Sequence, residues 1–135
     1  MELFLGGAFQ GKLEYVKSLY PDAEIFCESD FESLFDAENK NAVLCNFHLV
    51  VKNLLSAYID CYHEEAGKKA EEKILMMIEK NPGMKIISDE IGSGIVPVEK
   101  NDRLWRELSG HLLVKIAERS EKVVRIICGI PSRIK

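Results

Sequence analysis

Hydrophobic residues in this chain form short continuous runs separated by longer stretches in which apolar positions recur periodically. Continuous apolar runs are typical of strands in a parallel sheet that is covered on both faces. On this basis the chain has five expected strands and a short edge piece, at 3–5, 23–27, 41–47, 84–87, 123–128 and 132–135.

The intervening stretches predict helices. The clearest is 103–119, where a leucine or isoleucine stands at every fourth position from Leu104 to Ile116. Further helices are expected at 12–19, at 31–36 behind a capping Asp30, and along apolar stripes from Val51 to Tyr62 and from Ala66 to Ile78. Strands that alternate with helices predict one α/β domain over 1–135, in three layers, with a mostly parallel sheet and helices on both faces.

Composition narrows the classes of partner. The chain has 135 residues and a formal net charge of −4, which argues against nonspecific binding to nucleic acid or to an anionic membrane. No apolar run approaches the roughly 20 residues that span a bilayer, so no transmembrane helix is expected. The chain does not open with a basic segment followed by an apolar one, so a secretory signal is not expected either. The four cysteines form no CxxC pair, so free thiols in a reducing cytoplasm are expected.

A glycine-rich segment directly follows the first predicted strand. It reads Gly6-Gly7-Ala8-Phe9-Gln10-Gly11-Lys12-Leu13 and fits the G-x-x-x-x-G-K core of a P-loop. Glycines allow successive backbone N–H groups to curl around a phosphate, the following helix start favours an anion, and Lys12 can reach the β- and γ-phosphates. The same residues also fit an ordinary strand-to-helix turn. The segment predicts a P-loop NTPase-like domain with a nucleotide site at residues 6–13.

Two positions depart from a complete P-loop. Leu13 stands where a Ser or Thr hydroxyl would hold Mg²⁺. Asn46 stands at the end of the third strand, where an acid would be expected. The usual protein ligands of Mg²⁺ are therefore replaced, and no dedicated metal site is predicted.

The second half of the chain carries a more specific pattern. Asp89-Glu90 and the segment from Gly92 through Gly94 to Pro97 fit [ND]-E-[VI]-G-x-G-[IV]-V-P. They are followed by Arg103, Trp105, Arg106 and Gly110 in R-x-[FW]-R-x-x-x-G spacing, and by a G-x-P-x-x-[IL]-K ending at 129–135. The chain thereby resembles the bifunctional adenosylcobinamide kinase/adenosylcobinamide-phosphate guanylyltransferases of cobalamin biosynthesis, as a shortened and diverged member.

The resemblance implies ATP or GTP as the nucleotide, a corrinoid as a second ligand, and a homo-oligomer, trimeric in the family. Members of the family carry, between the second and third strands, a helix and loop with the histidine that accepts GMP covalently. That segment is missing here, and His48, His63 and His111 stand in other contexts, where they read as surface or packing residues. Guanylyl transfer is therefore expected to be lost.

Three functions stay open. The first is kinase-type phosphoryl transfer, with Lys12, Asp89 and Glu90 as catalytic residues and Gly92, Gly94 and Arg103 contacting substrate or phosphate. The second is a pseudo-enzyme that binds a nucleotide or corrinoid, as a regulatory or partner subunit, which Leu13 and Asn46 favour. The third is a structural α/β protein that has lost the site. Asp89 and Glu90 also fit simple turn-capping roles, and Arg103 fits a solvated charge on its helix.

Overall fold

The computed structural model describes residues 1–35 and 41–135, and the described strands form a six-stranded sheet. Its strand order is β2-β3-β4-β1-β5-β6. All neighbouring strands are parallel except β5 and β6, which pair antiparallel. The strands are β1 (Glu2–Gly6), β2 (Glu24–Phe26), β3 (Ala42–Leu44), β4 (Lys85–Asp89), β5 (Lys122–Ile127) and β6 (Ile130–Arg133).

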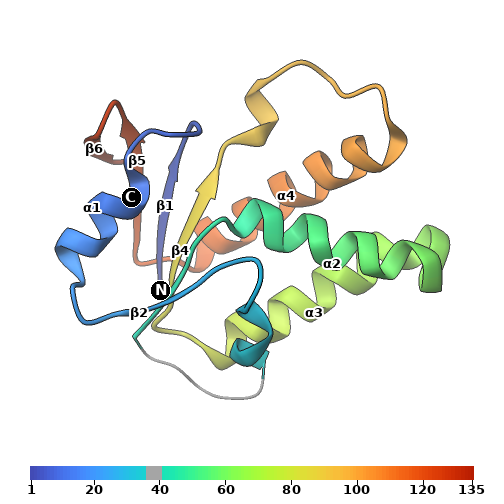
Figure 1. Cartoon of the computed structure of the whole chain (residues 1–135), viewed down its shortest axis with the longest axis horizontal. Helices are drawn as coiled ribbons and strands as arrows, with labels where there is room; N and C mark the ends of the chain where they lie inside the picture. Colours follow the sequence, from blue (N-terminus) through green and yellow to red (C-terminus); the bar gives the residue numbers. More distant parts are fainter. Residues whose placement is uncertain (36–40) are drawn as a thin grey trace.

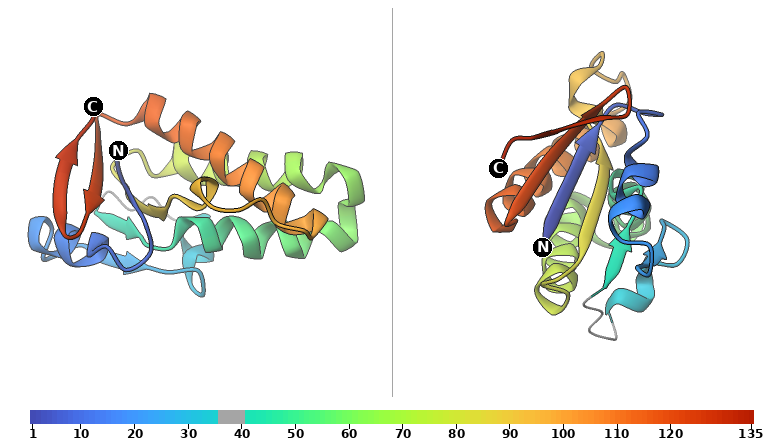
Figure 2. Two further views of the ribbon diagram at one scale, coloured as in Figure 1. Left: turned by 90° about the horizontal axis from the view of Figure 1, so that it is seen from above. Right: turned by 90° about the vertical axis from the view of Figure 1, so that its left-hand side faces the viewer.

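Helices cover both faces of this sheet, as Figures 1 and 2 show. One face carries α1 (Lys12–Leu19), and the other carries α2 (Phe47–Tyr62), α3 (Ala66–Lys80) and α4 (Lys100–Arg119). The predicted three-layer, mostly parallel α/β architecture is therefore confirmed. Helices α1 and α2 lie on opposite faces, but both begin at the carboxyl edge of the sheet, because each follows a parallel strand.

Adjacent residues of the central strands point into two separate cores. Leu3 and Ile86 lie in the core beneath α2, α3 and α4, whereas Phe4 and Ile87 lie in the core beneath α1. Successive side chains of a strand point to opposite faces, so a strand covered on both sides must be apolar at consecutive positions. This explains why the strands appear in the sequence as continuous runs.

Several element ends differ from the sequence-based expectation. The third strand ends at Leu44, and Phe47, which was predicted to end it, begins α2. Asn46 lies between them with φ of 52°, a left-handed conformation that breaks the strand and turns the chain into the helix. The edge piece expected at 132–135 is the antiparallel strand Ile130–Arg133.

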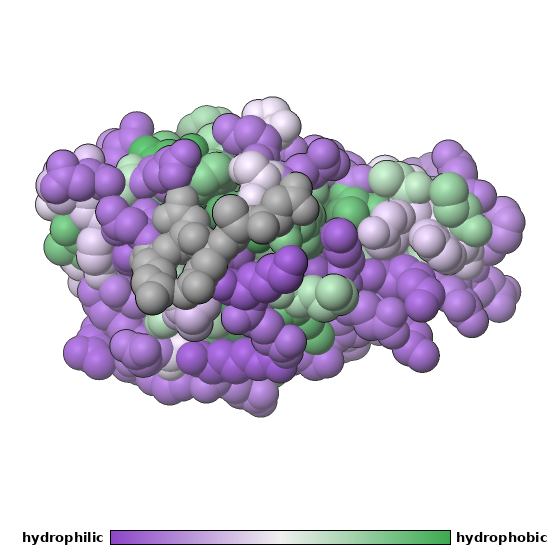
Figure 3. All heavy atoms as spheres, turned by 90° about the horizontal axis from the view of Figure 1, so that it is seen from below, coloured by the Kyte–Doolittle hydropathy of each residue, from purple (hydrophilic) through white to green (hydrophobic). Residues whose placement is uncertain are grey.

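The short helix expected at 31–36 is a 3₁₀ helix, Phe31–Phe35, and Asp36 lies outside the described residues. The Asp30 carboxylate accepts a hydrogen bond from the backbone N–H of Cys27 at 2.5 Å, on the preceding turn. Asp30 thus fixes the chain leaving β2, and it meets the following helix through its backbone carbonyl, which accepts a hydrogen bond from the N–H of Ser33 at 3.4 Å. The face of the molecule shown in Figure 3 is largely hydrophilic, with only small apolar areas.

Candidate functional site

The glycine-rich segment forms the turn from β1 into α1. Gly6 ends β1 so close to β5 that a Cβ atom there would collide with the carbonyl oxygen of Ile126. Gly11 has φ of 79°, in the left-handed region that favours glycine, and α1 begins at the next residue. Sterics therefore dictate two of the glycines of the motif.

Gln10 ties this turn to the β5–β6 turn. Its side-chain Oε1 accepts a hydrogen bond from the N–H of Cys128 at 2.5 Å, and its carbonyl accepts one from the N–H of Gly129 at 3.1 Å. Phe9, at the tip, is fully exposed with φ of 57°. The loop is thus fixed at its base and open to solvent at its tip.

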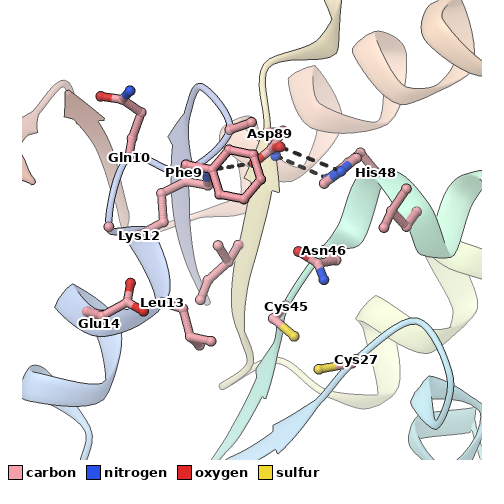
Figure 4. Close-up of a pocket in the computed structure, with 14 residues that line it drawn as sticks. Phe9, Gln10, Lys12, Leu13, Glu14, Cys27, Cys45, Asn46, His48 and Asp89 are labelled. Carbon is pink, nitrogen blue, oxygen red and sulfur yellow. Dashed lines mark hydrogen bonds and ion pairs between the residues drawn. The ribbon is translucent and has the colours of Figure 1, made fainter. Parts of the chain in front are cut away.

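Lys12 occupies the centre of the site and is only 7% exposed. Its Nζ donates to the carbonyl of Gly7 at 2.6 Å and lies 2.6 Å from Oδ1 of Asp89. The Lys12 ammonium group thus links the loop to the end of β4, and Figure 4 shows its contact with Asp89. Incoming phosphate oxygens could replace both partners, because they accept hydrogen bonds as the Gly7 carbonyl does and carry negative charge as the Asp89 carboxylate does.

Asp89 reaches Lys12 because of sheet order. The strand beside β1 is β4, and the register places Asp89 directly opposite Gly6. The third strand, which ends before Asn46, lies one strand farther away. The sequence named both Asp89 and Glu90 as candidates at this edge of the sheet, and the strand order and register show that Asp89 is the one that reaches Lys12.

Glu90, the next residue, faces a different part of the molecule. Its carboxylate pairs with Arg125 of β5 at 2.8 Å, and the two line a hollow together with Gly7, Gln10 and Ser93. The backbone N–H of Glu90 donates to the carbonyl of Gly6 at 3.1 Å. The structure thus separates the two predicted catalytic acids: Asp89 lies beside Lys12, and Glu90 does not.

His48 completes the buried side of the site, and the sequence analysis treated it only as a surface or packing residue. Its Nδ1 accepts a hydrogen bond from the N–H of Asp89 at 3.2 Å, and its Nε2 lies 3.7 Å from Oδ2 of the same residue. Burial lowers the pKa of His48, although the nearby Asp89 carboxylate opposes this. A neutral imidazole agrees with Nδ1 acting as acceptor.

Trp105 of α4 holds the same helix start in place, since its indole N–H donates to the carbonyl of His48 at 2.6 Å. The signal that could have found His48 was its position, because it stands in the first turn of a helix that starts at the carboxyl edge of the sheet. His63 and His111 lie elsewhere, His63 against a separate hollow beside α4 and His111 exposed on α4.

A cleft of about 470 Å³ joins these groups. The loop forms one wall and the start of α2 the other, with the ends of β2, β3 and β4 between them (Figure 4). Its lining residues are Ala8, Phe9, Gln10, Gly11, Lys12, Leu13, Glu14, Cys27, Cys45, Asn46, His48, Leu49, Ile87 and Asp89. A volume of this size is in the range of sites for small ligands and cofactors.

The donors available to a magnesium ion in this cleft are few. Leu13 lines it without an oxygen, and the amide of Asn46 donates to a carboxylate oxygen of Glu28 at 3.0 Å. Among the described residues no three acids, cysteines or histidines gather as a metal site. Asp89 offers one carboxylate, which fits an ion that binds mainly through substrate phosphates and water, as Mg²⁺ does in nucleotide sites.

The second glycine motif lies outside the cleft. The Arg103 guanidinium donates to the carbonyls of Pro97 and Val98, and that of Arg106 donates to the carbonyls of Ile95 and Gly92. Both arginines therefore clamp the loop before α4 onto that helix. The predicted phosphate contacts of Gly92, Gly94 and Arg103 stay predictions, and none of these three residues lines the cleft that contains Lys12.

The family model described as cobinamide kinase / cobinamide phosphate guanyltransferase matches residues 22–134. The chain belongs to this family. Its members are transferases of cobalamin biosynthesis that use a nucleotide as substrate. The match includes Asp89 and the arginine-clamped loop, whereas the loop at 6–13 precedes it.

No curated protein matches the chain. Of the helices described, none is long and apolar enough to cross a membrane.

Proposed function

We propose that this chain is the kinase part of the family's chemistry: it binds ATP or GTP at residues 6–13 and transfers the γ-phosphoryl group to a cobinamide-type hydroxyl. The observation that carries the proposal is the contact of Lys12 with Asp89 at 2.6 Å, at the carboxyl edge of the sheet and beside the start of α1. Phosphoryl transfer depends mainly on positioning and charge neutralisation, and these groups supply both.

In this proposal, the substrate hydroxyl oxygen bonds to the γ-phosphorus as the bond to the β,γ-bridging oxygen breaks. The nucleoside diphosphate leaves, and the hydroxyl proton passes to solvent. Lys12 moves from Gly7 and Asp89 to the phosphate oxygens, and backbone N–H groups of the loop share the remaining charge. Asp89 is the residue that would hold Mg²⁺, which supplies further neutralisation of the phosphates when bound. His48 fixes the backbone of Asp89 through the bond to its N–H.

Guanylyl transfer is not part of this proposal. His48 is the histidine that lines the cleft, and both its ring nitrogens face Asp89: Nδ1 accepts a hydrogen bond from the N–H of Asp89, and Nε2 lies 3.7 Å from Oδ2. Incubation with GTP labelled at the α-phosphate, followed by denaturation, is expected to leave no covalent label on the protein. A label that survives denaturation and disappears in His48→Asn would contradict this part.

The second candidate function is nucleotide binding without turnover. It is favoured by Leu13, which lines the cleft where a metal-binding hydroxyl would stand. Calorimetric titration with ATP and GTP, with and without Mg²⁺ and beside Lys12→Ala, separates the two. The kinase requires binding that depends on Lys12 and strengthens with Mg²⁺, followed by nucleoside diphosphate release when cobinamide is added. Binding that is indifferent to Mg²⁺, without release, identifies the pseudo-enzyme, and absence of binding contradicts both.

A further inference from the structure

Two cysteines far apart in the sequence meet in the floor of the cleft. The register of β2 and β3 pairs Phe26 with Leu44, and the N–H of Cys45 donates to the carbonyl of Phe26 at 2.8 Å. One residue beyond the cysteines, Asn46 donates to Glu28 at 3.0 Å. Cys27 and Cys45 each follow one residue of the last pair in this register, so the two strands leave them opposite one another just past their ends.

The two thiols also point the same way. Cys45 belongs to the core beneath α1, Cys27 packs against that core, and both line the cleft. Figure 4 shows their sulfur atoms close together. Parallel strands lie about 4.8 Å apart, which is within the Cα separation of about 4.4–6.8 Å that a disulfide requires.

We propose that Cys27 and Cys45 form a dithiol site that a low-molecular-weight disulfide, such as oxidised glutathione, converts to an intramolecular disulfide. Their accessibility assigns the order of events. Cys45 is 3% exposed, and burial together with the neighbouring Cys27 thiol raises its pKa to about 12, which keeps it protonated. Cys27 is partly exposed. Cys27 is thus the attacking residue and Cys45 the resolving one.

The reaction balances. The Cys27 thiolate attacks one sulfur of the small disulfide and releases one thiolate, which leaves a mixed disulfide on Cys27. Cys45 then gives its proton to solvent, attacks the Cys27 sulfur and releases the second thiolate. The two cysteines lose two electrons and two protons, and the small disulfide is reduced to two thiols.

The test uses the full chain, equilibrated with defined ratios of oxidised and reduced glutathione, blocked by alkylation and mapped by peptide mass. The oxidised protein is expected to keep Cys61 and Cys128 alkylated and to yield a linked peptide that joins Cys27 to Cys45. Cys61→Ser/Cys128→Ser is the matched control, because both residues are exposed, and it must form the same link. All four thiols alkylated, or links to Cys61 or Cys128, would overturn the proposal.

Single variants test the order of attack. Cys45→Ala is expected to accumulate one glutathione on Cys27, whereas Cys27→Ser is expected to leave Cys45 unmodified. Circular dichroism checks that both variants fold. Glutathione on Cys45 of Cys27→Ser, with Cys27 of the other variant unmodified, would overturn the assignment.

Oxidation should also change ligand binding, because both sulfur atoms line the cleft. We expect the disulfide form to bind nucleotide at least threefold more weakly than the reduced form. This expectation rests on the proposed function, whereas the mapping of the linked peptide does not need nucleotide. Equal affinities of the two forms would therefore refute the effect on binding and leave the disulfide established.

Discussion

The chain contains two glycine-rich loops that look alike in sequence and serve opposite purposes in the structure. The loop at 6–13 surrounds the ammonium group of Lys12, which is nearly buried beside Asp89. At the loop at 91–99, by contrast, Arg103 and Arg106 of α4 donate to backbone carbonyls of the loop and hold it against that helix. The two loops therefore differ in the partner of the nearby cation: Lys12 contacts a carboxylate as well as a carbonyl, whereas the contacts of Arg103 and Arg106 are with backbone carbonyls.

Steric demand separates the two loops most strongly. Gly6→Ala places a methyl group against the Ile126 carbonyl, whereas at Gly92 no atom lies within 4 Å of an added Cβ. Gly6→Ala should lower the free energy of unfolding by about 3 kcal/mol, at the upper end of overpacking effects, and Gly92→Ala should change it by less than about 0.5 kcal/mol. Urea denaturation measures both, and equal effects would show that the two loops are not distinct in this respect.

The second-largest difference is expected in how much nucleotide affinity depends on the cation beside each loop. Lys12→Ala is expected to weaken ATP or GTP binding by about 10- to 100-fold, the value of a hydrogen bond to a charged group. Arg106→Ala removes an equal charge from α4, where Arg106 holds the other loop, and should leave affinity within about twofold, because its partners are backbone carbonyls. Calorimetry decides between them. A loss of affinity in Arg106→Ala as large as that in Lys12→Ala would bring the second loop into the site.

Asp89 and Glu90 are adjacent in sequence but contact different cations, Lys12 and Arg125. Asp89→Asn removes a negative charge beside the expected phosphates, so metal-free nucleotide should bind about 3- to 10-fold more tightly, on the order of 1 kcal/mol of repulsion relieved. The strengthening by Mg²⁺ should disappear in the same variant. Glu90→Gln, whose parent carboxylate pairs with Arg125, should behave like the wild type. Titrations with and without Mg²⁺ test this, and the reverse pattern would exchange the roles of the two acids.

The smallest expected effect is the pH dependence contributed by His48. Because burial lowers its pKa in the folded chain, the unfolded chain binds the proton more readily between that lowered pKa and about 6.5. The contribution of His48 to stability is therefore complete above about pH 6.5 and declines as pH falls, by less than about 1.4 kcal/mol per unit. Urea denaturation at several pH values should show a shallower decline in His48→Gln than in the wild type, and an equally steep decline would contradict this role of His48.

The sequence by itself determined the layers, the elements and the glycine loop. Continuous apolar runs identified the parallel strands because central strands bury both faces, and the spacing of leucines identified α4, whose N-terminus the structure extends to Lys100. Lys12 was correctly placed as the first residue of its helix. These features are local: a strand, a helix and a tight turn each follow from a few neighbouring side chains.

Only the tertiary structure decided which polar groups meet. Strand order placed β4 beside β1 and so brought Asp89, not Asn46, to Lys12. It brought His48 onto the backbone of Asp89, gave Glu90 to Arg125, and matched Cys27 with Cys45 across 18 positions of sequence. Such contacts depend on how strands are arranged side by side, and that arrangement is set by the packing of whole helices on the sheet, which no local pattern of residues records.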